Sequence, residues 1–489
     1  MFFCSKEPQN NELILARIGD KNISVNEFIR RAEYVVRPSY CNSNSRVHKK
    51  IVLNSLIAEK LFSIEAGDTN TFIKSERVQA FLRGRKEQAM RYLQFLDNAY
   101  KKVEIDSLKL EQFIRNAGRT YMVEYYNAGD RQTASVIDKA IRSGEMSFEQ
   151  GLSNLGLFSE IPAREIKLEK TENLKILDAL YGDVVEKNQV IGPINTAADE
   201  YIFIKVKDWQ NTPLITQRDY TLRENQVSQL LKEKLSKNFY DSFIVSVMAG
   251  KNIEFSRETF LQFTQILGPY YFLSDEEKEI LRKNRFEETA DNDNLKRPSF
   301  ENFNEALQEI REQSLFKVGE DVWKVADLIE AVSSHPLVFR ERRLEPKNFG
   351  KELQMAIMDL VRDVYLTRNA YKEGYDKAVG VQREVMMWMD NYNYLYEKEK
   401  FLRSVAGDSV DNMDPSVVLD KYLNPHVDTL QKKYSDLVEI NLAALDSVRL
   451  TRIDMSVTQE NVPYAKPVPG FPVVTTDFRL DYGNKMKTN

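Results

Sequence analysis

One pattern occurs twice in this sequence, with its copies 300 positions apart. Residues 14–28 and 315–328 each contain a short apolar run, a glycine and then apolar residues at helical spacing. The glycines, Gly19 and Gly319, keep the offset of 300, and so do the apolar positions around them. Because glycine adopts the left-handed conformation that tight turns need, each copy is predicted to form a strand, a turn and a helix. An internal repeat governs the architecture of a whole chain, so we expect two related modules.

Two longer amphipathic helices follow in each copy, because apolar residues recur there with a period near 3.6. The first buried stripe consists of Leu53, Leu56, Ile57, Leu61 and Ile64 in copy one, and of Leu353, Ile357, Leu360, Val361 and Val364 in copy two. A helix over 217–248 and a strand at 252–255 are predicted to close the first copy. A helix from Pro415 and a strand at 437–440 are predicted to close the second. We expect core mutations such as Leu56→Ala or Leu360→Ala to affect only their own half.

Copy one also carries an insert, residues 117–210, where copy two has only a short loop around 406–409. The predicted order within the insert is a strand (121–126), a helix (133–143), a short helix from Met146, a Leu-Gly-x-Phe turn (155–158), a helix (173–181), a Gly-Pro turn (192–193) and a strand (201–209). This order resembles the parvulin-type peptidyl-prolyl isomerase domain. The flanking segments are similar to the chaperone module of SurA-like and PrsA-like periplasmic foldases. The fold expected from the resemblance is mainly α with an α+β insert, and it has two related helical chaperone modules, the first of which carries the parvulin-like domain.

The resemblance implies an isomerase-like domain without its usual catalytic groups. Active parvulins carry histidines on their first and last strands, whereas His48, His335 and His426 all lie outside 117–210. We therefore assign no catalytic residue and predict an inactive isomerase domain, although Glu124 and Tyr125 leave an active isomerase as an alternative. The apolar proline pocket of the family falls on four residues, which are either a substrate-binding remnant or the core of the domain: Phe148, Leu157, Phe158 and Phe203.

Charge and cysteine content limit the partners that we expect. The chain has 69 basic and 74 acidic residues and a formal net charge of −5, spread along its length, so no nucleic acid is expected to bind. Cys4 follows two aromatic residues, as at the end of a lipoprotein signal, and is predicted to be lipidated. No internal apolar run approaches the roughly 20 residues of a membrane span, so a lipid on Cys4 would be the only membrane link. With Cys41 as the only other cysteine, no disulfide framework, metal site or cofactor is predicted.

These features together predict a periplasmic chaperone, tethered to the outer membrane as a lipoprotein. Its partners would be unfolded or nascent polypeptides, including outer-membrane proteins. An accessory scaffold in an envelope export or assembly machine is a further alternative, with the proline-rich tail as its docking strand. The predicted segments are an N-terminal anchor segment (1–13), the first helical module (14–116), the parvulin-like domain (117–210), a returning helix that completes the first module (211–284), a linker and connecting helix (285–314), the second module (315–450) and an extended tail (451–489).

Overall fold

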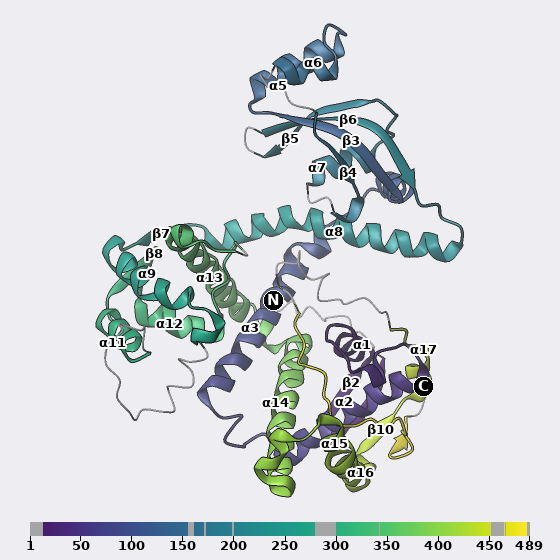
Figure 1. The fold of residues 1–489 in the computed structure, drawn as a ribbon, viewed down its shortest axis with the longest axis vertical. Coiled ribbons are helices and arrows are strands. Elements are labelled where there is room, and N and C mark those ends of the chain that lie inside the picture. Colours follow the sequence, from purple (N-terminus) through teal and green to yellow (C-terminus); the bar gives the residue numbers. More distant parts are fainter. Residues whose placement is uncertain are drawn as a thin grey trace, which may run out of the picture. The chain divides into compact units, whose positions relative to one another are not determined.

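The computed structural model describes residues 13–154, 161–170, 173–197, 200–278, 300–341, 343–450, 464 and 466–486. This part of the chain is mainly helical and contains three small sheets, in agreement with the predicted mainly α fold with a β-containing insert (Figure 1). It divides into two compact units. Phe95–Phe243 form one, here called the insert unit, and Met1–Gln94 with Ile244–Asn489 form the other, here called the core unit.

The N-terminal part of the core unit forms the predicted strand, turn and helix, but a second strand that was not predicted lies between the turn and the helix. Its elements are β1 (Ile14–Ile18), β2 (Lys21–Ser24), α1 (Val25–Glu33), α2 (Arg46–Ala66) and α3 (Glu76–Asn98), the last of which continues into the insert unit. Gly19 turns the chain between the strands with a φ of 60°, a value that glycine adopts without steric cost. Ser24 then starts α1, because its hydroxyl accepts a hydrogen bond from the Glu27 N–H at 3.1 Å.

The second copy of the pattern forms the same succession of elements. They are β8 (Ser314–Val318), β9 (Asp321–Lys324), α12 (Val325–Ser334), α13 (Phe349–Lys372) and α14 (Val379–Ala406). Gly319 makes the turn with a φ of 58°. The elements between α14 and the next strand are all helical: the 3-10 helix Gly407–Asn412, α15 (Pro415–Val418), the π-helix Leu419–Leu423, α16 (Asn424–Lys433) and the 3-10 helix Ser435–Leu437. No second α+β insert is therefore present after α14, as the short loop predicts.

The closing strands lie at the predicted positions, but each completes the sheet of the other copy. Strand β7 (Ile253–Phe255) pairs with β8, and β10 (Val438–Ile440) pairs with β1. The helices are exchanged in the same way, since α2 packs against α14 (Figure 1) and α3 donates a hydrogen bond to α13, from Arg91 Nη1 to Thr367 Oγ1 at 2.6 Å. The expectation that residues 211–284 complete the first copy is therefore corrected for β7.

The two exchanged sheets have the same register. Arg17 lies opposite Glu439 in one, and Lys317 lies opposite Glu254 in the other. The Gly19 N–H donates to the Leu437 carbonyl at 2.9 Å, and the Gly319 N–H donates to the Asn252 carbonyl at 3.1 Å. Both strand pairs β1–β2 and β8–β9 also contain an irregularity, between Ile14 and Ala16 and between Ser314 and Phe316. After the closing strands, α17 (Leu442–Ser447) follows β10 and α9 (Arg257–Tyr271) follows β7, and α11 (Phe300–Ile310) packs on α9.

The C-terminal segment is part of the core unit. Residues 466–483 contain no helix, as their prolines predict, and they pack along α1, α2 and α14 with Val474 fully buried. Strand β11 (Asn484–Lys485) then adds to β10 in parallel, so that the sheet order is β11-β10-β1-β2. The other sheet of the core unit, β7-β8-β9, has three strands among the described residues.

The insert unit is built around a four-stranded sheet of order β4-β3-β6-β5. Its elements are α4 (Ser107–Asn116), β3 (Arg119–Ala128), α5 (Arg131–Arg142), α6 (Phe148–Asn154), β4 (Ala163–Ile166), α7 (Leu174–Leu177), the π-helix Asp178–Gly182, β5 (Val190–Ala197), β6 (Glu200–Asn211) and α8 (Gln217–Met248), which returns to the core unit. Gly192 and Pro193 do not form the predicted turn. They lie inside β5, where the register shifts between Ile191 and Ile194.

Candidate functional site

The structure brings together two of the four predicted substrate-binding residues. Phe148 and Phe203 both contact Tyr126, with ring centroids 4.8 and 5.4 Å apart, and both side chains are buried. They form a small core cluster between α5, α6 and the sheet. This is the arrangement of a domain core, the second of the two readings of these residues. Leu157, Phe158 and the predicted lipidation site Cys4 lie outside the described residues.

The polar residues of β3 already have partners. Glu124 forms an ion pair with Lys207 at 3.3 Å, and the Tyr125 ring lies 4.6 Å from the Arg164 guanidinium. Tyr126 differs, since its hydroxyl is buried without a hydrogen-bond partner among the described residues, and burial raises its pKa to about 12. A phenol with that pKa stays protonated at neutral pH and cannot act there as a general base.

The three histidines have structural surroundings in the core unit. His48 Nδ1 accepts a hydrogen bond from the Ser43 N–H at 3.0 Å. His335 hydrogen-bonds Glu87, and His426 stacks on Phe401 with ring centroids 3.7 Å apart. Burial lowers the pKa of His426. The contacts of His335 and His426 give these two side chains a role in packing. His48 Nδ1 also lies 2.9 Å from Ser43 Oγ, which accepts a hydrogen bond from the Ser45 N–H at 3.2 Å in the turn before α2.

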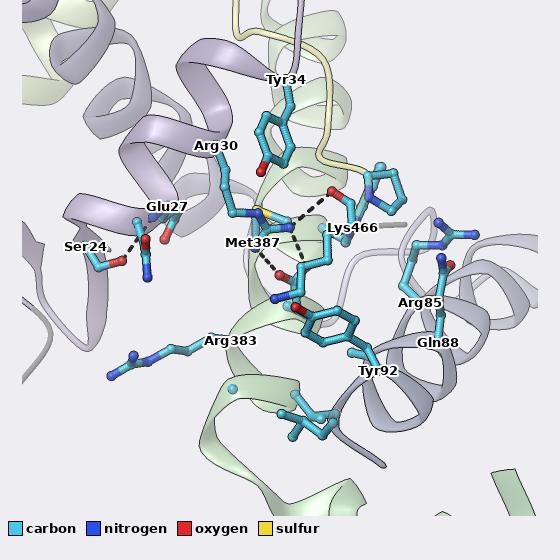
Figure 2. A pocket seen from close by; sticks show the side chains of 18 of the residues that line it. Ser24, Glu27, Arg30, Tyr34, Arg85, Gln88, Tyr92, Arg383, Met387 and Lys466 are labelled. Carbon is cyan, nitrogen blue, oxygen red and sulfur yellow. Dashed lines mark hydrogen bonds and ion pairs between the residues drawn. The ribbon is translucent and has the colours of Figure 1, made fainter. Parts of the chain in front are cut away.

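A cavity of about 430 Å³ opens in the core unit between α1, α3, α14 and the start of the C-terminal segment (Figure 2). Its volume falls within the range of sites that bind small molecules or peptide side chains. It is lined by Ser24, Asn26, Glu27, Ile29, Arg30 and Tyr34, by Arg85, Gln88, Ala89, Tyr92 and Leu93, by Gly380, Val381, Arg383, Glu384, Met387 and Trp388, and by Lys466 and Pro467. More than half of these residues are apolar or aromatic. Four of the side chains are basic and two are acidic, so positive charges outnumber negative charges in the walls.

Two of the four basic side chains that line this cleft, Lys466 and Arg85, lie over aromatic rings. Lys466 Nζ lies 3.7 Å from the centroid of Tyr92, and the Arg85 guanidinium lies 5.2 Å from that of Phe81 and 6.0 Å from that of Trp388. Arg30 forms an ion pair with Glu384, and its Nη2 atom also donates to the Lys466 carbonyl at 3.4 Å (Figure 2). Burial and the nearby charge of Arg30 lower the pKa of Lys466 to about 8. Burial also lowers the pKa of Arg85.

The surface beside the cleft holds an extended segment of the chain by its backbone. Four donors contact main-chain carbonyls of residues 466–477: Arg30 to Lys466 at 3.4 Å, Arg31 to Gly470 at 3.1 Å, Tyr394 to Val473 at 3.3 Å and Asn54 to Asp477 at 2.8 Å. Because every residue has a carbonyl, such donors recognise an extended chain with little regard to its side chains. Sequence reasoning missed this site, because its residues come from four distant segments that share no local motif.

Comparison of the chain with protein-family models, with curated proteins and with solved structures found no match. None of the helices in the described ranges is both long enough and apolar enough to cross a membrane. The same ranges contain no cluster of three or more His, Cys, Asp or Glu side chains that could hold a metal ion.

Proposed function

We propose that this protein is a chaperone of the periplasmic foldase type, which binds unfolded or nascent envelope polypeptides in an extended form. The observation that carries the proposal is the set of donors from α1, α2 and α14 that hold residues 466–477 by their carbonyls. Helices α1 and α14, together with α3, also line the open cleft next to Lys466 and Pro467. A client chain would place an apolar or aromatic side chain in the cleft. Side-chain donors of the kind that hold residues 466–477 would bond the carbonyl groups of its backbone. Binding of this kind needs no nucleotide or metal.

The finer architecture is proposed along with it. The core unit would consist of two related modules that arose by duplication and exchanged their closing strands. The shared register of the two sheets supports this, and so do Gly19 and Gly319, which turn the chain with nearly the same φ. Residues 117–210 of the insert unit would be a parvulin-like domain, supported by the order of their elements. Without a histidine anywhere in Phe95–Phe243, that domain would have lost its catalysis and would serve as a second binding surface.

The cellular setting is also part of the proposal. An N-terminal lipid on Cys4 would tether the chaperone to the outer membrane, facing the periplasm, where outer-membrane proteins pass as unfolded chains. An accessory role in an envelope assembly machine would use the same binding surfaces.

The proposal is tested by aggregation of a reduced, unfolded client protein in the presence of the full chain. We expect wild-type protein to suppress aggregation at equimolar amounts and Trp388→Ala to lose most of that suppression, because Trp388 forms an apolar wall of the cleft. Tyr396→Ala is the matched control. It removes another half-buried aromatic side chain of α14, which stacks on Phe72 with centroids 5.9 Å apart and does not line the cleft. A wild-type chain that suppresses no aggregation would refute the chaperone proposal, and equal loss in the two variants would refute the role of the cleft.

A further inference from the structure

The two sheets of the core unit differ at one edge. In the sheet β11-β10-β1-β2, the outer edge of β10 is covered by β11, and the Met486 N–H donates to the Ile440 carbonyl at 3.0 Å. The other sheet matches this one residue for residue across its central pair, with Phe255 opposite Phe316 as Ile440 is opposite Ala16. Yet β7, the counterpart of β10, has no strand on its outer edge among the described residues.

Hydrogen-bond alternation fixes which groups of β7 point outward. In an antiparallel pair, neighbouring residues alternate between bonding the partner strand and pointing away from it. Asn252 and Ser256 bond β8, from the Gly319 N–H to the Asn252 carbonyl at 3.1 Å and from the Ser256 N–H to the Leu315 carbonyl at 2.9 Å. The main-chain groups of Ile253 and Phe255 therefore point away from β8, just as those of Val438 and Ile440 point toward β11. An exposed edge of this kind is a template for another strand.

Side-chain burial shows the same difference. Val438 and Ile440 are buried, whereas Ile253 and Phe255 are only half-buried. The helix behind the sheet agrees. Ala58 of α2 is 0% exposed and belongs to the same core cluster as Val474 of the C-terminal segment, whereas Met358, 300 positions later on α13, is 36% exposed. The second sheet thus has the apolar surface that the C-terminal segment covers on the first, without such a cover among the described residues.

We infer that the outer edge of β7 is a second binding site of this protein, which takes an extended segment of an unfolded polypeptide as an added strand. The occupant pairs its main chain with Ile253 and Phe255 and covers them with apolar side chains, as β11 and the residues before it do for β10. This inference rests on the proposed chaperone function for the nature of its occupant. Strand addition suits such clients, because main-chain pairing gives affinity while side chains are read only weakly.

The test uses a short fluorescein-labelled peptide of alternating valine and threonine and the full chain. Ile253→Pro removes an outward N–H and blocks the edge, and we expect it to weaken binding about tenfold, which corresponds to the loss of one or two hydrogen bonds. Val322→Pro is the matched control, since Val322 lies on the opposite edge strand of the same sheet, half-exposed, and also points its N–H away from β8. Binding that survives Ile253→Pro, or that falls equally in Val322→Pro, would overturn the inference.

A second measurement needs no variant. Hydrogen exchange of the wild-type Ile253 and Phe255 amides should slow when the peptide is added, and peptide binding without that protection would overturn the inference even if Ile253→Pro fails to fold. Self-association of the chain through this edge, abolished by Ile253→Pro, would assign the edge to a second copy and would also overturn the inference.

The aggregation assay separates the two proposals. A folded Ile253→Pro variant that has lost peptide binding but still suppresses client aggregation leaves the chaperone proposal intact. If the wild-type protein suppresses no aggregation, the chaperone proposal fails, while the peptide measurements still decide whether the β7 edge binds a strand.

Discussion

At the scale of single residues, the most constrained feature is a group of charges buried between α2, β2 and α14. Lys21 Nζ donates to Asp390 Oδ1 at 2.7 Å and Lys60 Nζ donates to Asp390 Oδ2 at 3.0 Å, with all three side chains buried. Burial raises the pKa of Asp390, but the charges of Lys60 and Lys21 outweigh it and leave the pKa below its usual value. The aspartate is therefore ionised and ties the two halves of the sequence together.

Asp390→Ala should destabilise the core unit by about 3–5 kcal/mol, because it removes the counter-charge of the buried Lys21 ammonium and leaves the buried Lys60 ammonium with Glu27 alone. Urea unfolding of the full chain measures this change. Asp408→Ala is the control, since the Asp408 side chain is 99% exposed in its ion pair with Arg403 and its loss should cost no more than about 0.5 kcal/mol. Similar losses for both variants would show that the buried charges do not stabilise the fold.

Lys466 gives a prediction about pH. Its pKa is about 8 in the folded protein and near 10.4 in an unfolded chain, so the unfolded state binds more protons between those two values. Stability should therefore rise with pH in that window and stay level below it, because a protonated Lys466 opposes folding. Lys466→Met removes this term. From about pH 7 to pH 10, the free energy of unfolding of the wild type should rise relative to that of Lys466→Met. If the two free energies change in parallel with pH, the lowered pKa of Lys466 is contradicted.

At the scale of elements, the sequence predicted where each helix and strand lies along the chain better than which sheet each strand joins. The long helix α8 spans Gln217–Met248 as predicted, and β7 and β10 lie within a residue of their expected positions. What the pattern could not decide is which sheet each closing strand joins. Both strands alternate apolar, glutamate, apolar, as Ile253-Glu254-Phe255 and Val438-Glu439-Ile440, so each fits either sheet equally well. The choice depends on which helices lie nearby in space, and that is not a local property.

Other misses have similar causes. Strand β4, Ala163–Ile166, has three exposed residues in four and so lacks the alternation that marks a strand. The Ser- and Asn-rich sequence around Cys41 predicts a loop, but Cys41 lies buried in the 3-10 helix Ser39–Cys41, where burial raises its pKa to about 11. The cleft combines Arg30, Arg85, Glu384 and Lys466, which are up to 436 positions apart. The sequence left Phe148 and Phe203 as either a substrate-binding remnant or the core of the insert, and both side chains are buried in a core cluster of the insert.

At the scale of the whole molecule, the exchange removes the independence that was expected of the two halves. Leu56 lies in one core cluster with Tyr394 and Leu402, so Leu56→Ala removes contacts made by both halves of the sequence. Neither half contains a complete sheet of its own, because β1 needs β10 and β8 needs β7. Each half on its own would also expose the helix faces that α2 and α14 bury against one another.

Two fragments, residues 1–284 and 300–489, provide the corresponding experiment. Fragment 300–489 alone should show no cooperative unfolding transition, because β8 lacks β7 and α14 lacks α2. Co-expressed fragments should instead co-purify as a one-to-one complex that unfolds cooperatively. Asp390→Ala in the second fragment should weaken this complex, since Lys21 and Lys60 belong to the first fragment, and Asp408→Ala should not. A cooperative transition of fragment 300–489 by itself would mean that the second half completes its own fold, and the exchange of strands would then not be required for folding.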